Sequence, residues 1–185
     1  MYARERIAWF GIPVGCAVLA LKAAAWLATG SAALYSDALE SIVNVAASVV
    51  ALVALRIAAR PADTDHPYGH GKAEFFAAVI EGALIVVAAL SIFESAWDAW
   101  RAPRAIETPW VGLALSAAAT VLNGAWAAVL LRGGKRHRSP ALTADGHHLL
   151  SDVATSVALG IGVGATVATG WWAMDPALAA LAGLY

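Results

Sequence analysis

The sequence predicts an all-α membrane protein, a bundle of six transmembrane helices in which the sixth is truncated. Of its 185 residues, 61% are hydrophobic and only 14% are charged, which is too apolar for an ordinary soluble domain. The apolar residues are also gathered into long stretches of about 20 residues or more, the helical length that crosses the hydrocarbon core of a bilayer. Composition and segment length together favour a helical membrane domain.

Five apolar stretches are long enough to span, and a sixth begins near the end of the sequence. The expected spans are residues 8–29, 34–58, 73–97, 109–131 and 141–170, with the sixth from residue 175 onward. The residues from Asp175 to Tyr185 are too few to cross a bilayer at about 1.5 Å per helical residue. We therefore expect residues 1–185 to form one transmembrane domain with a shortened sixth helix.

The basic residues of the connections predict the orientation. With a cytoplasmic N-terminus, the Lys and Arg residues on the cytoplasmic side are Arg4, Arg6, Arg56, Arg60, Lys72, Arg132, Lys135, Arg136 and Arg138. Only Arg101 and Arg104 lie on the other side, while Lys22 falls within the first span. This bias satisfies the positive-inside rule. The first apolar segment lacks a small-residue cleavage site, so we expect a retained span rather than a signal peptide.

Charge and cysteine content exclude several other classes of protein. The formal net charge of −1 provides no basic stripe for nucleic acid. Cys16 is the only cysteine, so neither a disulfide framework nor a cysteine zinc module can form within the chain. We expect no organic cofactor and no nucleic-acid partner; the expected surroundings are a lipid bilayer.

Polar residues lie at helical spacing inside the second and fifth spans. The second contains "YSDALESIVNVAAS", where Asp37, Glu40 and Asn44 stand at i, i+3 and i+7. The fifth contains "HHLLSDVATS", where His148 and Asp152 stand at i and i+4. Both spacings place the side chains on one face of a helix, and ionisable groups in hydrocarbon must face protein or water.

The depths of these pairs match. At about 1.5 Å per residue, Glu40 and Asn44 lie about 9–15 Å below the outer edge of the core, and His148 and Asp152 about 14–20 Å below it. Two carboxylates, an imidazole and an amide oxygen suit a first-row divalent cation. Without the ion the carboxylates would repel and at least one should take up a proton, so metal and proton would compete for one site, as an antiporter requires.

Interhelical hydrogen bonding is the alternative role for such residues, and for a lone Asn or Ser in a span it is the better one. Two pairs at matching depth favour a functional site instead. Asp37, which lies nearer the outer end, and Asp145 are candidates for a polar lining of the pathway, with local hydrogen bonding as the other role for Asp37. His147 points about 100° away from His148 on the helix.

A second candidate cation site lies in the loop "RPADTDHPYGHGKAEFF". Its Asp63, His66 and His70 could gather around one cation, because Pro67 and the glycines prevent a continuous helix and allow a folded turn. A solvated loop without metal remains the alternative.

The segments "SDALESIVNVAAS", "RPADTDHPYGHGKAE" and "HHLLSDVATS" resemble, in this order, the cation diffusion facilitator family of divalent-metal transporters. The resemblance implies a six-helix domain, usually a homodimer, that exports Zn²⁺ or a related ion from the cytoplasm in exchange for protons. It assigns the transport site to Glu40, Asn44, His148 and Asp152, and a loop site of some members to Asp63, His66 and His70. We expect the cytoplasmic C-terminal domain of many members to be absent from this sequence.

The second-helix pair departs from the family pattern, which is most often Asp or His followed by Asp. Asn44 supplies a neutral, hard amide oxygen, so Mn²⁺, Fe²⁺ and Co²⁺ stay open beside Zn²⁺. The expected location is a bacterial inner (plasma) membrane, and the chain is not expected to be an enzyme. An intramembrane metal-dependent hydrolase remains an alternative, although no HExxH or GxSxG pattern occurs. A structural or sensory metal-binding bundle is the other alternative.

Overall fold

The computed structural model describes residues 3–58, 60–137 and 140–184. Its helices are α1 (Ala3–Thr29), α2 (Ala32–Ala58), α3 (Ala73–Arg101), α4 (Pro109–His137), α5 (Pro140–Thr169) and α6 (Met174–Ala182). Helices α1 to α5 each contain a segment long and apolar enough to cross a membrane. The predicted all-α membrane fold is confirmed, and each predicted span corresponds to one helix.

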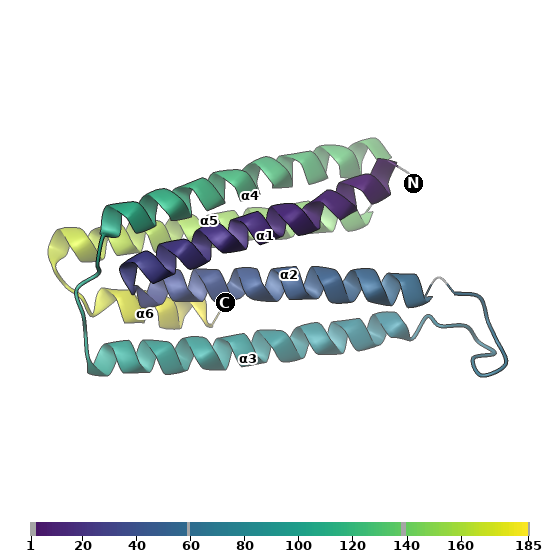
Figure 1. The fold of residues 1–185 in the computed structure, drawn as a ribbon, viewed down its shortest axis with the longest axis horizontal. Helices are drawn as coiled ribbons and strands as arrows, with labels where there is room; N and C mark the ends of the chain where they lie inside the picture. The colour runs from purple at the N-terminus through teal and green to yellow at the C-terminus, as the bar shows by residue number, and fades with distance from the viewer. Residues whose placement is uncertain (1–2, 59, 138–139, 185) are drawn as a thin grey trace.

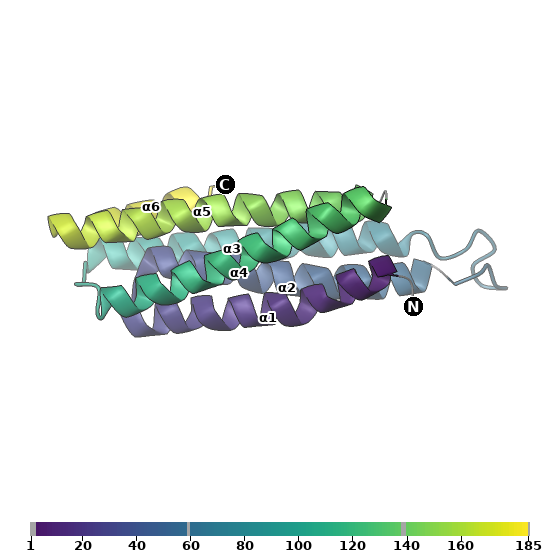
Figure 2. The same cartoon turned by 90° about the horizontal axis from the view of Figure 1, so that it is seen from above.

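The long helices run side by side along the length of the molecule (Figures 1 and 2). One end carries the N-terminus, the loop between α2 and α3, and the start of α5; we call it the amino-terminal end. The opposite end carries the turn between α1 and α2, the connection from α3 to α4, and the turn before α6. Helices α2 and α5 therefore run in opposite directions, as the depth argument requires.

Helix α3 lies at the side of the bundle, where it packs against α2 and α6 (Figure 1). Large apolar side chains remain exposed along its length, among them Phe75 at 76%, Val79 at 70% and Leu90 at 64%. Because lipid tails are as apolar as these side chains, such exposure is compatible with a membrane and unfavourable in water. The surface of α3 thus agrees with a spanning helix.

Glycine permits a close approach between α1 and α4. A Cβ atom placed on Gly112 of α4 would lie only 2.1 Å from Cγ2 of Thr29 and 3.3 Å from the Ala25 carbonyl oxygen in α1. Small residues at helix contacts allow membrane helices to pack through van der Waals contact where no hydrophobic driving force exists. The α1–α4 contact fixes the part of the bundle against which α2 and α5 lie.

Asp175 of α6 attaches that helix to the start of α2. Its Oδ2 accepts a hydrogen bond of 2.6 Å from the backbone N–H of Ala32, and its Oδ1 accepts one of 2.5 Å from the Ser31 hydroxyl. A carboxylate at a helix N-terminus satisfies free N–H groups and complements the positive end of the helix dipole. This cap holds the beginning of α2 in place two turns before Glu40.

Candidate metal site

The polar pairs predicted on α2 and α5 meet in the structure. The Asn44 amide nitrogen donates a hydrogen bond of 2.8 Å to Oδ2 of Asp152, and the Asn44 amide oxygen lies 3.3 Å from Nε2 of His148. His148 Nε2 also lies 3.9 Å from Oδ1 of Asp152 on the same helix. Three of the four expected ligands are therefore in mutual contact across the α2–α5 interface.

Glu40 completes the group from one helical turn earlier on α2. Its carboxyl group lies close enough to that of Asp152 for the two to interact electrostatically. Two carboxylates repel each other in a medium of low dielectric constant, and a cation between them would offset that repulsion. The arrangement thus places two carboxyl groups beside an imidazole and an amide.

The side chains of this group differ in their exposure. The His148 side chain is 57% exposed, whereas that of Asp152 is only 3% exposed. His148 also lies nearer the amino-terminal end, because α5 begins there. The imidazole of His148 is therefore exposed on the amino-terminal side of the buried Asp152 carboxylate.

The other predicted residues surround the site without joining the contact chain. Asp145 is exposed one turn before His148 on α5, on the amino-terminal side. His147 is also exposed, and its position on the helix directs it away from the His148 face. Asp145 therefore remains a candidate for the approach to the site, whereas His147 lies off the helical face that the expected ligands share.

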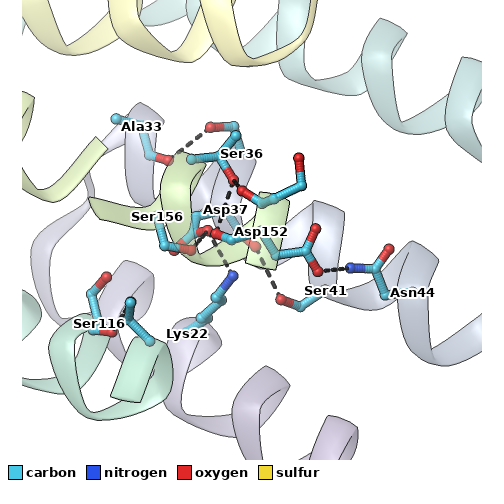
Figure 3. Close-up of polar contacts among 12 residues, drawn as sticks. Lys22, Ala33, Ser36, Asp37, Ser41, Asn44, Ser116, Asp152 and Ser156 are labelled. Carbon is cyan, nitrogen blue, oxygen red and sulfur yellow. Dashed lines mark hydrogen bonds and ion pairs between the residues drawn. The ribbon is translucent and has the colours of Figure 1, made fainter. Parts of the chain in front are cut away.

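Asp37 has a partner that the sequence analysis did not assign. The Lys22 ammonium donates a hydrogen bond of 2.7 Å to Oδ1 of Asp37, and the Ser156 hydroxyl donates another of 2.7 Å to the same oxygen (Figure 3). Lys22 and Asp37 are each 1% exposed. The available signal was a charged residue inside an apolar span, which requires a partner.

The loop between α2 and α3 gathers the second predicted cluster. The ligand atoms of Asp63, His66 and His70 all lie within 4.8 Å of one another. Oδ1 of Asp63 lies 3.0 Å from Nδ1 of His66, and Oδ2 lies 3.4 Å from Nε2 of His70. One carboxylate and two imidazoles form a suitable donor set for a first-row divalent cation.

The imidazoles also affect the acid–base behaviour of the loop carboxylate. Desolvation acts to raise the pKa of Asp63, but hydrogen bonds from the His66 side chain and backbone, with the nearby positive charges of the two imidazoles, hold it below its ordinary value. The lowered pKa keeps Asp63 ionised at neutral pH, the form that binds a cation.

Comparison with known proteins shows the family to which this sequence belongs. The sequence matches the model of the cation efflux transmembrane domain over residues 8–185. The chain belongs to the cation efflux family. This confirms the family resemblance of the sequence motifs and shows that the chain is a multi-pass membrane protein.

Relatives of the cation efflux domain come from several bacteria. An uncharacterized transporter of Synechocystis is 49% identical over 168 residues, which cover 91% of this chain and 54% of the relative. A cation-efflux pump FieF of Shewanella oneidensis is 32% identical over 168 residues, 91% of this chain and 56% of the relative. The FieF pump of Serratia proteamaculans is 34% identical over 174 residues, which cover 91% of this chain and 56% of the relative. The chain spans about half the length of these curated relatives.

Proposed function

We propose that this chain forms the membrane pathway of an exporter of divalent metal cations, and that Glu40, Asn44, His148 and Asp152 bind the transported ion. The observation that carries the proposal is the contact chain joining these residues between α2 and α5. The ligand set suits Zn²⁺ or a related first-row ion such as Mn²⁺, Fe²⁺ or Co²⁺.

The site favours transport over the two alternative functions. A metal-dependent hydrolase needs a metal-bound water and a separate general base, whereas Glu40 and Asp152, the two carboxyl groups of this site, are both assigned as ligands. A structural metal site would be closed on all sides, but His148 is exposed. A buried carboxylate reached past an exposed imidazole is the arrangement of a site that loads and unloads.

Proton antiport follows from the same ligands. Metal must displace the protons that the carboxyl groups and the imidazole hold, so apparent metal affinity should weaken as pH falls through their titration range. Because Asn44 does not titrate, the coupling protons would bind to Glu40, His148 and Asp152. Acid on the exit side would then assist release of the metal.

The proposed setting of this exporter is a bacterial inner membrane with the amino-terminal end in the cytoplasm. The positive-inside bias supports a cytoplasmic amino-terminal end, and the bacterial relatives support a bacterial inner membrane. The family resemblance further implies a homodimer. Metal would then enter the site from the cytoplasm past His148 and leave toward the opposite end.

The function can be tested with the full-length protein in liposomes. We expect Zn²⁺ or Mn²⁺ flux to be faster with the proton gradient than after an ionophore collapses it, and a pH dye to report protons moving against the metal. The matched control is protein-free liposomes under the same gradient. Flux that ignores the gradient, with no counter-movement of protons, would identify a channel or facilitated carrier instead.

We also propose that Asp63, His66 and His70 bind a second divalent cation. His70→Ala should lower the number of Co²⁺ ions bound per chain from two to about one, because the remaining Asp63 and His66 make an incomplete donor set for such an ion. Asp65→Asn is the matched control, since Asp65 lies in the same loop outside the cluster. An unchanged count in the Co²⁺ absorption titration of His70→Ala would contradict the loop site.

A further inference from the structure

A cluster of three buried residues lies beside the proposed metal site but contains none of its ligands. Lys22 of α1, Asp37 of α2 and Ser156 of α5 form this Lys22–Asp37–Ser156 cluster, and their exposed fractions are 1%, 1% and 2%. It is therefore a sealed polar contact that joins three helices inside the bundle (Figure 3).

The cluster lies one helical turn beyond the metal site, toward the opposite end. Asp37 precedes Glu40 by three residues on α2, and Ser156 follows Asp152 by four residues on α5. Because the two helices run in opposite directions, both steps lead away from the amino-terminal end. The exposed His148 thus lies on one side of the buried ligands, and the cluster lies on the other.

The ion pair of Lys22 and Asp37 makes this layer a barrier held by opposite charges. The Lys22 ammonium group attracts the carboxyl groups of Glu40 and Asp152, while the Asp37 carboxylate acts on them in the opposite direction. A metal ion leaving toward the opposite end would have to pass the point where Lys22 meets Asp37. That passage requires the ion pair to separate.

The hydrogen bonds of Asp37 are incomplete in a way that favours such a separation. Lys22 and Ser156 both donate to Oδ1, while the buried Oδ2 has no hydrogen-bond partner among the residues that the structure describes. By contrast, Asp175 uses both oxygens to cap α2. A buried carboxylate oxygen without a partner is rare and calls for an explanation, and here it leaves Asp37 able to accept a different donor.

We propose that Lys22 and Asp37 are positioning residues that close the metal site toward the opposite end and separate when metal is released. This inference rests on the proposed transport through Glu40, Asn44, His148 and Asp152. Lys22 and Asp37 act on the ion through the path they block, not as ligands.

The test uses the full-length protein with Cys16 and any other cysteine replaced and a reporter introduced by Ser41→Cys. Ser41 is 4% exposed and follows Asp37 by one turn, on the metal-site side of the cluster. A small, membrane-impermeant thiosulfonate added at the opposite end can reach this thiol only past the cluster. Reagent added at the amino-terminal end provides the comparison.

The Lys22→Met/Asp37→Asn double variant removes both charges and keeps similar side-chain volumes, a change that buried ion pairs often tolerate. Since minor conformations are commonly populated at 0.1–10%, loss of the ion pair should raise labelling from the opposite end about tenfold. Equilibrium Zn²⁺ binding should stay within about threefold, because no ligand is changed and the two charges removed have opposite signs, so that their effects on Glu40 and Asp152 largely cancel. Ser156→Ala keeps both charges and should fold even if the double variant does not. It should also raise labelling from the opposite end, by a smaller factor than the double variant does.

Asp175→Asn is the control, since Asp175 is another buried carboxylate near the opposite end with a capping role. It should lower thermal stability and leave labelling unchanged. If the parent transports Zn²⁺ but the thiol stays shielded in both the double variant and Ser156→Ala, the ion pair is only structural and this inference fails alone. A parent that transports no metal overturns the proposed function and this inference with it.

Discussion

Asp152→Ala should abolish metal flux in liposomes while the protein remains folded and inserted. Asp152 contacts Asn44, His148 and Glu40, so its loss removes a charged ligand and the residue that links the others. Changes to groups that merely support a metal ligand typically cost 10–100-fold, so loss of the ligand itself should lower flux by more than about 100-fold. Initial rates of Zn²⁺ and Mn²⁺ uptake measure the effect, and a thermal melt in detergent checks the fold.

His147→Ala is the matched control for that result. His147 is exposed on the same helix and does not share the face of His148, so its replacement should leave flux within about twofold of the parent. Parent-like flux in Asp152→Ala would remove the α2–α5 pairs from the transport pathway. Equal losses in both variants would instead indicate that α5 tolerates no substitution here, and the isosteric Asp152→Asn variant would then separate charge from shape.

Much of the fold could be predicted from the sequence because the bilayer imposes segment length. Each stretch of about 20 apolar residues must form a helix, since backbone groups in hydrocarbon can be satisfied only internally. The ends of the helices were less accessible to prediction. Helix α4 continues to His137, six residues beyond the predicted end at residue 131, because helices extend past the hydrocarbon into polar sequence such as Lys135 and Arg136.

The candidate site could be predicted from residue spacing on α2 and α5, but its surroundings could not. Helical periodicity fixes which residues share a face, and so it identifies His148 with Asp152. It does not fix the rotation of α1 about its own axis, which decides that Lys22 pairs with Asp37. The capping of α2 by Asp175 depends likewise on the return of α6 across the opposite end, which local sequence does not encode.

Asn44→Asp should change the order in which the protein prefers metals. Asn44 now presents a neutral amide whose nitrogen bonds Asp152 and whose oxygen faces His148. An aspartate would add a third carboxylate and remove the amide donor, so the site would hold a divalent ion by charge more strongly. We expect the rate ratio of Zn²⁺ to Mn²⁺ to shift by about tenfold, or ~1.4 kcal/mol.

The extra carboxylate must also change the proton dependence. Three carboxyl groups in one site cannot all ionise without a counter-ion, so the variant should hold more protons when empty and lose apparent metal affinity more steeply as pH falls. Ser48→Asp provides the control, because Ser48 is exposed one turn further along α2 and would add the same charge without supplying a ligand. Unchanged ratios among Zn²⁺, Mn²⁺, Fe²⁺ and Co²⁺ in Asn44→Asp would show that Asn44 is not a ligand. A change in the rate ratios that occurs in Asn44→Asp but not in Ser48→Asp would assign metal selectivity to the Asn44 amide. The reason is that the electric field of a nearby charge would act on all four ions alike.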